Sequence, residues 1–218
     1  MREAVISLVH ERRFWIAVTT LVIAVTIAWF GWWGYSAFAI ARDRRAQLAF
    51  VEQLDQFDAI RANPDADPIA WEALEIGFAR GYVDHSSSSL APFFLAFQAE
   101  ALIHKGLHDE ALKLMDKAVA GMRSGSDVYY LYATKRAVMR LDSATAEVSA
   151  QGKRELLDLA QNSNNSSQGL AWYHLLQYAI VHNDEDLRKL AHSKLQIYPV
   201  LAQQQVRQLF EASVEGNE

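Results

Sequence analysis

Residues 92–123, PFFLAFQAEALIHKGLHDEALKLMDKAVAGMR, decide the fold. Apolar residues recur through both halves of this stretch with the spacing of one helical face. Gly106 separates the halves and is suited to ending the first helix. Asp109 and Glu110 then suit the first turn of a second helix, where the helix dipole favours negative charge. The stretch therefore predicts two helices joined by a short turn.

Taken as a 34-residue unit that starts at Pro92, the stretch resembles a tetratricopeptide repeat. The core positions of that repeat fall on Leu95, Ala99, Leu102, Gly106, Ala111, Met115 and Ala118. Ala99 and Ala111 are small, so the two helices are expected to cross closely. The Trp, Tyr and Pro of the repeat pattern are replaced by Leu95, Leu102 and Arg123.

Further helices are predicted on both sides of this unit. Asp67 and Pro68 are typical of a helix start, which places a helix over 69–82. Two more pairs are expected downstream, followed by a capping helix; their ranges are 127–142 with 145–161, 168–184 with 185–199, and 201–214. Each pair has one apolar face that it cannot bury alone, so the pairs should stack into an all-α solenoid.

A long segment near the N-terminus has the character of a membrane span. No charged residue occurs from Phe14 to Ala41, and residues 14–33 are about as long as a helix that crosses the hydrocarbon of a bilayer. Aromatic residues that favour the headgroup level stand at both ends of the span: Trp15, and then Trp29, Trp32, Trp33 and Tyr35. We expect a tail over 1–13, a transmembrane signal-anchor helix with a juxtamembrane extension over 14–41, and the repeat domain over 42–218.

Three alternatives to an anchor exist for this segment. One is a twin-arginine export signal, but Arg12-Arg13 lacks the surrounding consensus. A buried core helix can be equally apolar, but it rarely carries aromatic residues at both ends. A cleavable signal peptide is the stronger rival, because Ala37-Phe38-Ala39 resembles a cleavage site. The apolar run, however, exceeds the usual 7–15 residues of such a peptide. Arginines flank both ends evenly, and the short tail favours a cytoplasmic N-terminus with the domain outside the cytoplasm.

Composition excludes several classes of function. The chain of 218 residues has no cysteine, so it cannot form disulfides, a thiolate zinc site or a cysteine nucleophile. Its net charge is −5, with acidic and basic residues mixed along the repeat domain. Because no basic stripe is present, nucleic acid is not an expected partner.

The sequence contains no recognisable motif of catalytic residues. His104 and His108 are four residues apart, but Gly106 lies between them and no HExxH motif surrounds them. The acidic run 184–186 opens a predicted helix, where the dipole accounts for it. Glycine-rich phosphate loops and the G-x-S-x-G motif are missing. We expect no catalytic residue, no cofactor and no metal ion.

Aromatic residues gather on the first helix of each predicted pair: Phe93, Phe94, Tyr129, Tyr130, Tyr132, Trp172 and Tyr173. Such helices usually line the binding face of a solenoid, although any single ring can equally belong to the core. We take Phe93, Glu100 and Tyr130 as candidate residues of a partner-binding groove.

The order of these parts resembles the ancillary subunits of the SecYEG translocon. The similarity lies in Gln47-Leu48-Ala49-Phe50 after the span, in residues 88–119 and in residues 169–195. The span departs from that family because it is far richer in tryptophan than the family's membrane helix. The resemblance implies an inner-membrane protein with a periplasmic repeat domain. Its partners would be translocon subunits, a membrane-anchored periplasmic chaperone or emerging chains.

We therefore expect a membrane-tethered module that binds proteins and catalyses no reaction. Tethering raises the effective concentration at the membrane, so a modest affinity can suffice. The alternative is a structural subunit whose tryptophan-rich helix packs into a larger membrane complex.

The first prediction concerns the N-terminal segment. Residues 14–33 should remain in the mature protein, because their apolar run is too long for a typical signal peptide. N-terminal sequencing of the purified protein checks this, and a mature chain that starts at Ile40 or Arg42 would contradict the anchor.

Overall fold

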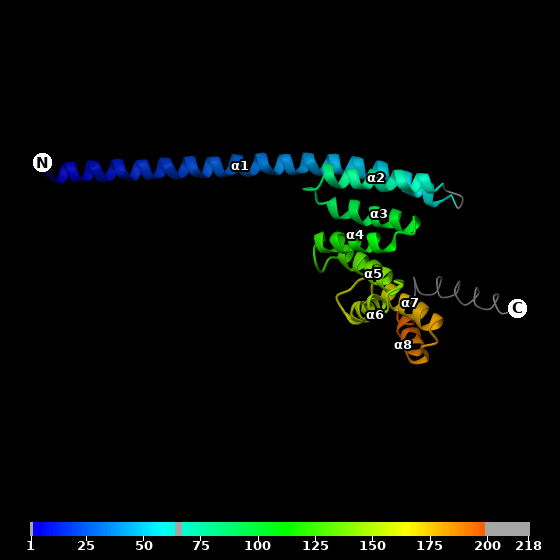
Figure 1. Ribbon diagram of the computed structural model, residues 1–218. Helices are drawn as coiled ribbons and strands as arrows, with labels where there is room; N and C mark the ends of the chain where they lie inside the picture. Colours follow the sequence, from blue (N-terminus) through cyan, green and yellow to red (C-terminus); the bar gives the residue numbers. More distant parts are fainter. Residues whose placement is uncertain (1, 64–66, 199–218) are drawn as a thin grey trace. The chain divides into compact units, whose positions relative to one another are not determined.

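The computed structural model describes residues 2–63 and 67–198, without the side chains of residues 2–24, 31, 34 and 37. The described backbone forms eight α-helices (Figure 1): α1 (Arg2–Arg61), α2 (Pro68–Asp84), α3 (Ala91–His104), α4 (His108–Gly121), α5 (Asp127–Leu141), α6 (Ala146–Gln161), α7 (Gln168–Val181) and α8 (Glu185–Leu195). The all-α prediction is confirmed. The capping helix expected over 201–214 lies outside the described residues.

The chain divides into two units, residues 1–49 and 50–218. In the first unit, large apolar side chains between residues 25 and 40 are all more than half exposed. They are Val25, Ile27, Trp29, Phe30, Trp32, Trp33, Tyr35, Phe38 and Ile40. Within the described residues, no helix has a stretch long and apolar enough to cross a membrane. Residues 14–24, which include Trp15, lie outside the residues whose side chains are described.

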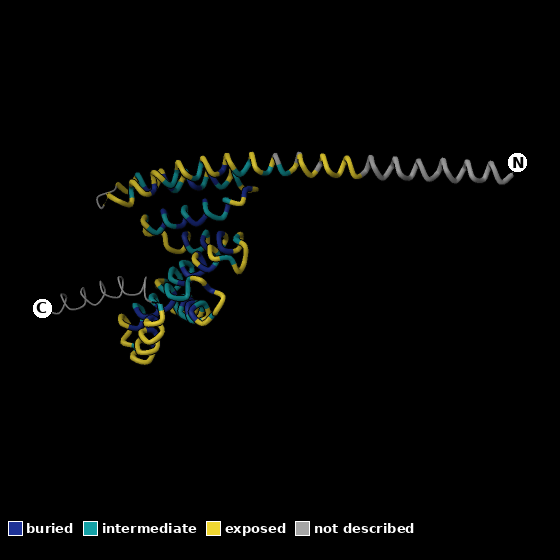
Figure 2. The backbone as a smooth tube through the Cα atoms, turned by 180° about the vertical axis from the view of Figure 1, so that it is seen from behind, coloured by how far each residue is buried: buried dark blue, intermediate teal, exposed yellow. Residues whose placement is uncertain are grey.

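The second unit is a series of paired helices that contact one another in chain order. Residues 50–61 of α1 precede α2, and the pairs α3 and α4, α5 and α6, and α7 and α8 follow. The second helix of each pair also packs against the first helix of the next, as in α2 with α3 and α6 with α7. Figure 2 shows buried residues along these packed helices and exposed residues at the turns. Helical-repeat packing is therefore confirmed.

Small residues occupy the places where two paired helices cross. Ala99 on α3 and Ala111 on α4 are completely buried and belong to the same core cluster. In the next pair the same role falls to Gly152 on α6, which was not identified from the sequence. A Cβ atom at Gly152 would lie 2.5 Å from the backbone nitrogen of Leu141 and 2.7 Å from the carbonyl oxygen of Ala137. The α6 backbone thus rests directly on the backbone of α5.

Two of the pairs are joined by the same kind of turn. After α3, Gly106 has a φ of 77°, and the amide of Leu107 donates to the Leu102 carbonyl at 3.0 Å. After α7, Asn183 has a φ of 54°, and the amide of Asp184 donates to the Ala179 carbonyl at 2.9 Å. Both are Schellman-type endings, in which a left-handed residue lets the chain reverse. The predicted role of Gly106 is confirmed, and the same kind of turn joins α3 to α4 and α7 to α8.

Three groups of side chains form the core of the second unit. Rings of Phe50, Phe57, Trp71, Phe78, Phe94 and Phe97 join α1, α2 and α3. A second group joins α3, α4 and α5 around Met115 and Ala133, and a third joins α5 to α8 around Leu156 and Leu175. Because α5 contributes Ala133 to one group and Ala137 to the other, it couples the first half of the stack to the second.

The second prediction concerns Gly152. Gly152→Ala should lower the free energy of unfolding by about 1–3 kcal/mol, because the new methyl group meets backbone atoms that cannot move aside. Urea unfolding of the full-length chain followed by circular dichroism measures the change.

Gly169→Ala is the matched control, since its Cβ atom would have no neighbour nearer than 3.4 Å. In a helix this change alone should be neutral or stabilising by about 0.5–1 kcal/mol. If both variants unfold like the wild type, α5 and α6 do not cross at Gly152.

Candidate functional site

The first helices of successive pairs contact one another directly and form one surface. We call this surface the first-helix face; it consists of residues 50–61 of α1 with α3, α5 and α7. The ring centroids of Phe50 and Phe93 lie 6.3 Å apart, and those of Phe93 and Tyr132 lie 5.8 Å apart in an edge-on contact. A few contacts between α5 and α7 extend the surface. Side chains from different pairs are thereby brought to one place.

An ion pair crosses the junction of α3 and α5. The Nζ atom of Lys135 donates a hydrogen bond to the Oε1 atom of Glu100. The same Nζ atom lies 5.2 Å from the centroid of the Tyr132 ring, a cation–π distance. Phe93, Glu100, Tyr132 and Lys135 therefore form one cluster, which we call the α3–α5 cluster.

The chemistry of Tyr132 in this cluster is that of a neutral phenol. Burial and the nearby Glu100 carboxylate raise the pKa of Tyr132 to about 12. Both effects disfavour the phenolate, because the charged form would be buried and would face another negative charge. Tyr132 can pack and donate a hydrogen bond, but it is not poised to act as a base.

The three candidate groove residues do not all lie together. Phe93 is half-buried and Glu100 is partly buried, and both belong to the α3–α5 cluster. Tyr130 is buried instead; its hydroxyl accepts a 3.3 Å hydrogen bond from the side-chain amide of Asn162. Two residues along a helix correspond to roughly 200° of rotation, so Tyr130 and Tyr132 point to different sides of α5.

Sequence reasoning missed two members of the cluster as site residues, Tyr132 and Lys135. One signal was present: Lys135 follows Glu100 by 35 residues, close to the 34-residue period of the repeat. Opposite charges one period apart are placed on neighbouring first helices when the pairs stack. The structure adds that Val128 and Leu131, on the same helix α5, are 40% and 37% exposed.

The α7 part of the first-helix face is polar. His174 Nδ1 lies 3.1 Å from Gln177 Oε1, and Gln177 Nε2 donates to the Tyr173 hydroxyl at 3.1 Å. Burial lowers the pKa of His174 and raises the pKa of Tyr173. Both groups are therefore kept uncharged near neutral pH, and they offer hydrogen bonds rather than charge.

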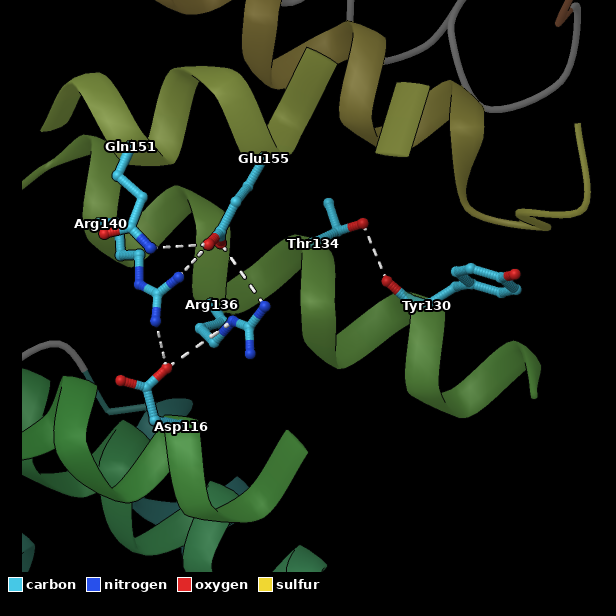
Figure 3. Close-up of polar contacts among 7 residues, drawn as sticks. All are labelled: Asp116, Tyr130, Thr134, Arg136, Arg140, Gln151 and Glu155. Carbon is cyan, nitrogen blue, oxygen red and sulfur yellow. Dashed lines mark hydrogen bonds and ion pairs between the residues drawn. The ribbon is translucent and has the colours of Figure 1, made fainter. Parts of the chain in front are cut away.

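A separate polar network joins three helices elsewhere on α5 (Figure 3). Arg136 and Arg140 of α5 lie between Asp116 of α4 and Glu155 of α6, and Figure 3 shows both arginines reaching both carboxylates. Arg140 Nη2 lies 2.5 Å from Asp116 Oδ1. Two positive and two negative charges balance one another, so this network fixes the stacking of the pairs and holds no spare charge for a ligand.

The histidines are dispersed. His104 stacks on Trp71 with ring centroids 3.7 Å apart, and burial lowers its pKa. His108 is exposed at the start of α4. In the part of the chain that the structure describes, no group of three or more His, Asp or Glu side chains could hold a metal ion.

Of the expected membrane-interface residues, Trp29, Trp32, Trp33 and Tyr35 are 66–75% exposed. The side chain of Trp15 is not described. The exposed rings are available to a bilayer or to another protein.

Comparison with known proteins does not assign the chain to a family. No protein-family model, no curated protein and no solved structure matches the chain. The site must therefore be interpreted from its own geometry.

The third prediction concerns Tyr132. The pKa of Tyr132 is 10 in the unfolded chain and about 12 in the folded chain. The stabilising contribution of the neutral Tyr132 is therefore complete below pH 10, and it is lost as the pH rises through about 12. Tyr132→Phe should therefore lose less stability than the wild type between pH 10 and 12. The difference corresponds to at most about 3 kcal/mol.

Tyrosinate absorbance and urea unfolding across this pH range measure the effect. Tyr129→Phe on the same helix, which leaves Tyr132 in place, is the control. If Tyr132→Phe and the wild type lose stability in parallel, Tyr132 is not buried beside Glu100.

Proposed function

We propose that this chain is a membrane-tethered protein-interaction module that binds partners on its first-helix face. The observation that carries the proposal is the α3–α5 cluster together with the exposed Val128 and Leu131. Apolar side chains beside an ion pair and an aromatic group are suited to an extended segment or helix of another protein. The proposal assigns no reaction to the chain.

The tether is supported by the composition and exposure of α1. Residues 14–41 carry no charge, and large apolar side chains between residues 25 and 40 are exposed on the isolated chain. Apolar surface left in water costs roughly 25 cal/mol per Å², so this length of helix requires a covering environment. A bilayer supplies that environment along residues 14–33, with Trp29, Trp32 and Trp33 at one headgroup level.

The resemblance to ancillary translocon subunits supports a more specific form of this proposal. In that form the domain after Arg42 lies in the periplasm and meets translocon subunits, a membrane-anchored chaperone or emerging chains. A surface that offers half-exposed apolar residues and hydrogen-bonding groups, as α5 and α7 do, suits chains of varied sequence.

A structural role is the second candidate, and the exposed tryptophans of α1 favour it. Trp29, Trp32 and Trp33 are 66–75% exposed and can pack against other membrane helices as well as against lipid. Such a subunit would be present in fixed stoichiometry with its partners, whereas an interaction module would have exchanging, substoichiometric partners.

The fourth prediction tests the first-helix face. The full-length chain is purified in mild detergent, and the co-purifying proteins are identified and quantified by mass spectrometry. Leu131→Asp should reduce those partners at least tenfold, because a carboxylate would enter the proposed contact surface. Leu131 is already 37% exposed, so the fold should tolerate the change.

Leu190→Asp is the matched control, since Leu190 is 42% exposed but belongs to α8, the second helix of its pair. It should retain the partners. The proposal would be contradicted if both variants lost their partner proteins equally or if both retained them equally. It would also be contradicted if the wild-type chain purified without any partner protein. A fixed stoichiometry that survives Leu131→Asp would favour the structural subunit.

A further inference from the structure

Among the described helices, α8 is packed along a single narrow line. Its buried residues are Leu187, Ala191 and Leu195, and every other residue of the helix is exposed. The second helices α4 and α6 differ, because each also carries partly buried residues beside its buried ones. In these two cases the following first helix packs against the second helix, α5 on α4 and α7 on α6. Within the described residues, no helix follows α8.

The uncovered side of α8 offers apolar contacts. Leu190 is 42% exposed, and Ile197, just past the end of the helix, is 68% exposed. The amide of Ile197 donates to the Lys194 carbonyl at 3.2 Å, so the chain still coils at this point. Seven residues make nearly two helical turns, which brings Ile197 back to about the same side as Leu190. We call Leu190 and Ile197 the α8 stripe.

Helix α4 shows how a residue in this place is covered. The buried residues of α4 include a line with the same four-residue spacing as that of α8: Ala111, Met115 and Val119. Leu114 lies one residue before the middle of that line, as Leu190 does on α8. Leu114 is partly buried against the core group that joins α3, α4 and α5. The α8 stripe therefore lies where a further first helix would pack.

The chain also leaves α8 as it leaves α4. At the end of α4, a Cβ atom on Gly121 would lie 3.0 Å from Pro92 Cγ at the start of α3. Just after α8, the Tyr198 hydroxyl donates to Gln168 Oε1 at 2.7 Å, at the start of α7. In both pairs the end of the second helix thus lies beside the start of the first. The connection to α5 begins there, and residues 199–218 continue from the corresponding point after α8.

The sequence that follows has the spacing and length of a first helix. The connections from a second helix to the next first helix have six, five and six residues: 85–90, 122–126 and 162–167. The helix expected over 201–214 would begin after five residues, 196–200, and would have 14 residues. Helices α3 and α7 have 14 residues each and α5 has 15.

The expected helix also has one apolar and one polar side. At about 100° per residue, one side carries four apolar residues: Ala202, Val206, Leu209 and Phe210. The opposite side is polar and consists of Gln204, Arg207, Gln208 and Glu211. A helix that ends a solenoid needs this division, because its inner side buries the last pair and its outer side meets water.

We propose that residues 201–214 form a helix that docks on the α8 stripe of the same chain through Val206, Leu209 and Phe210. Covalent attachment selects this occupant, since a segment joined to α8 by five residues is present at a far higher local concentration than a free partner. The contact is made by a second helix, so this inference goes beyond the first-helix face and does not depend on it.

Hydrogen exchange of the full-length chain in mild detergent, measured by mass spectrometry, tests the contact. The amides of residues 201–214 should exchange at least tenfold more slowly than those of an unfolded segment. Leu190→Ser, which leaves residues 201–214 unchanged, should return them to the unfolded rate. Phe210→Ser should have the same effect and should also speed exchange in α8.

Two matched controls should leave the exchange of residues 201–214 unchanged. Val181→Ser alters an aliphatic residue of α7 that is 76% exposed, and Gln208→Ser alters the polar side of the expected helix. The proposal is overturned if residues 201–214 of the wild type exchange at the unfolded rate, or if their protection survives both Leu190→Ser and Phe210→Ser. Protection that appears only as the concentration of the chain is raised would also overturn it, because a second copy would then cover the stripe.

Discussion

The packing of paired helices through small residues is the constraint on which the rest of the second unit depends. Ala99 and Ala111 are fully buried at one crossing, and Gly152 meets the backbone of α5 at another. Larger side chains at these positions would separate the helices and expose the apolar face that each pair must bury. When the two helices of each pair pack together, the first helices of neighbouring pairs come into contact. This contact brings together the α3–α5 cluster, which consists of Phe93, Glu100, Tyr132 and Lys135.

Stacking between the pairs has a second component, which is charge. One ion pair joins α2 to α3, another joins α3 to α5, and a third joins α6 to the start of α8: Glu75 with Lys105, Glu100 with Lys135 and Lys153 with Asp184. The network of Arg136 and Arg140 adds contacts from α5 to both α4 and α6. Surface ion pairs contribute little stability individually, usually below about 1 kcal/mol, so their value here lies in the register that they select. Apolar contacts hold the pairs together, and the charges determine which side chains face one another.

The sequence predicted the helices well and the site only in part, for physical reasons that differ. Helix existence depends on local signals such as the Asp67 cap, whose side chain accepts from the Ile69 amide at 2.9 Å, and the left-handed Gly106. Phe93 and Glu100 could be assigned to one surface because they lie two turns apart on one helix. Tyr130 could not be separated from Tyr132 in this way, because the side that each ring faces depends on how α5 packs between α4 and α6. The α8 stripe was not recognised, since an exposed aliphatic residue and a core residue look alike until the neighbouring helices are in place.

The most direct test of the account is whether α3 and α5 lie side by side at the α3–α5 cluster. The chain has no cysteine, so Glu100→Cys with Lys135→Cys provides a unique pair for a short bismaleimide cross-linker. Efficient cross-linking within one chain is predicted, detected by mass spectrometry of the peptides that carry both sites. A matched pair, Glu100→Cys with Lys189→Cys on α8, should not react within the chain. Failure of the first pair to cross-link, or equal reaction of the two pairs, would contradict the stacking from which the first-helix face is built.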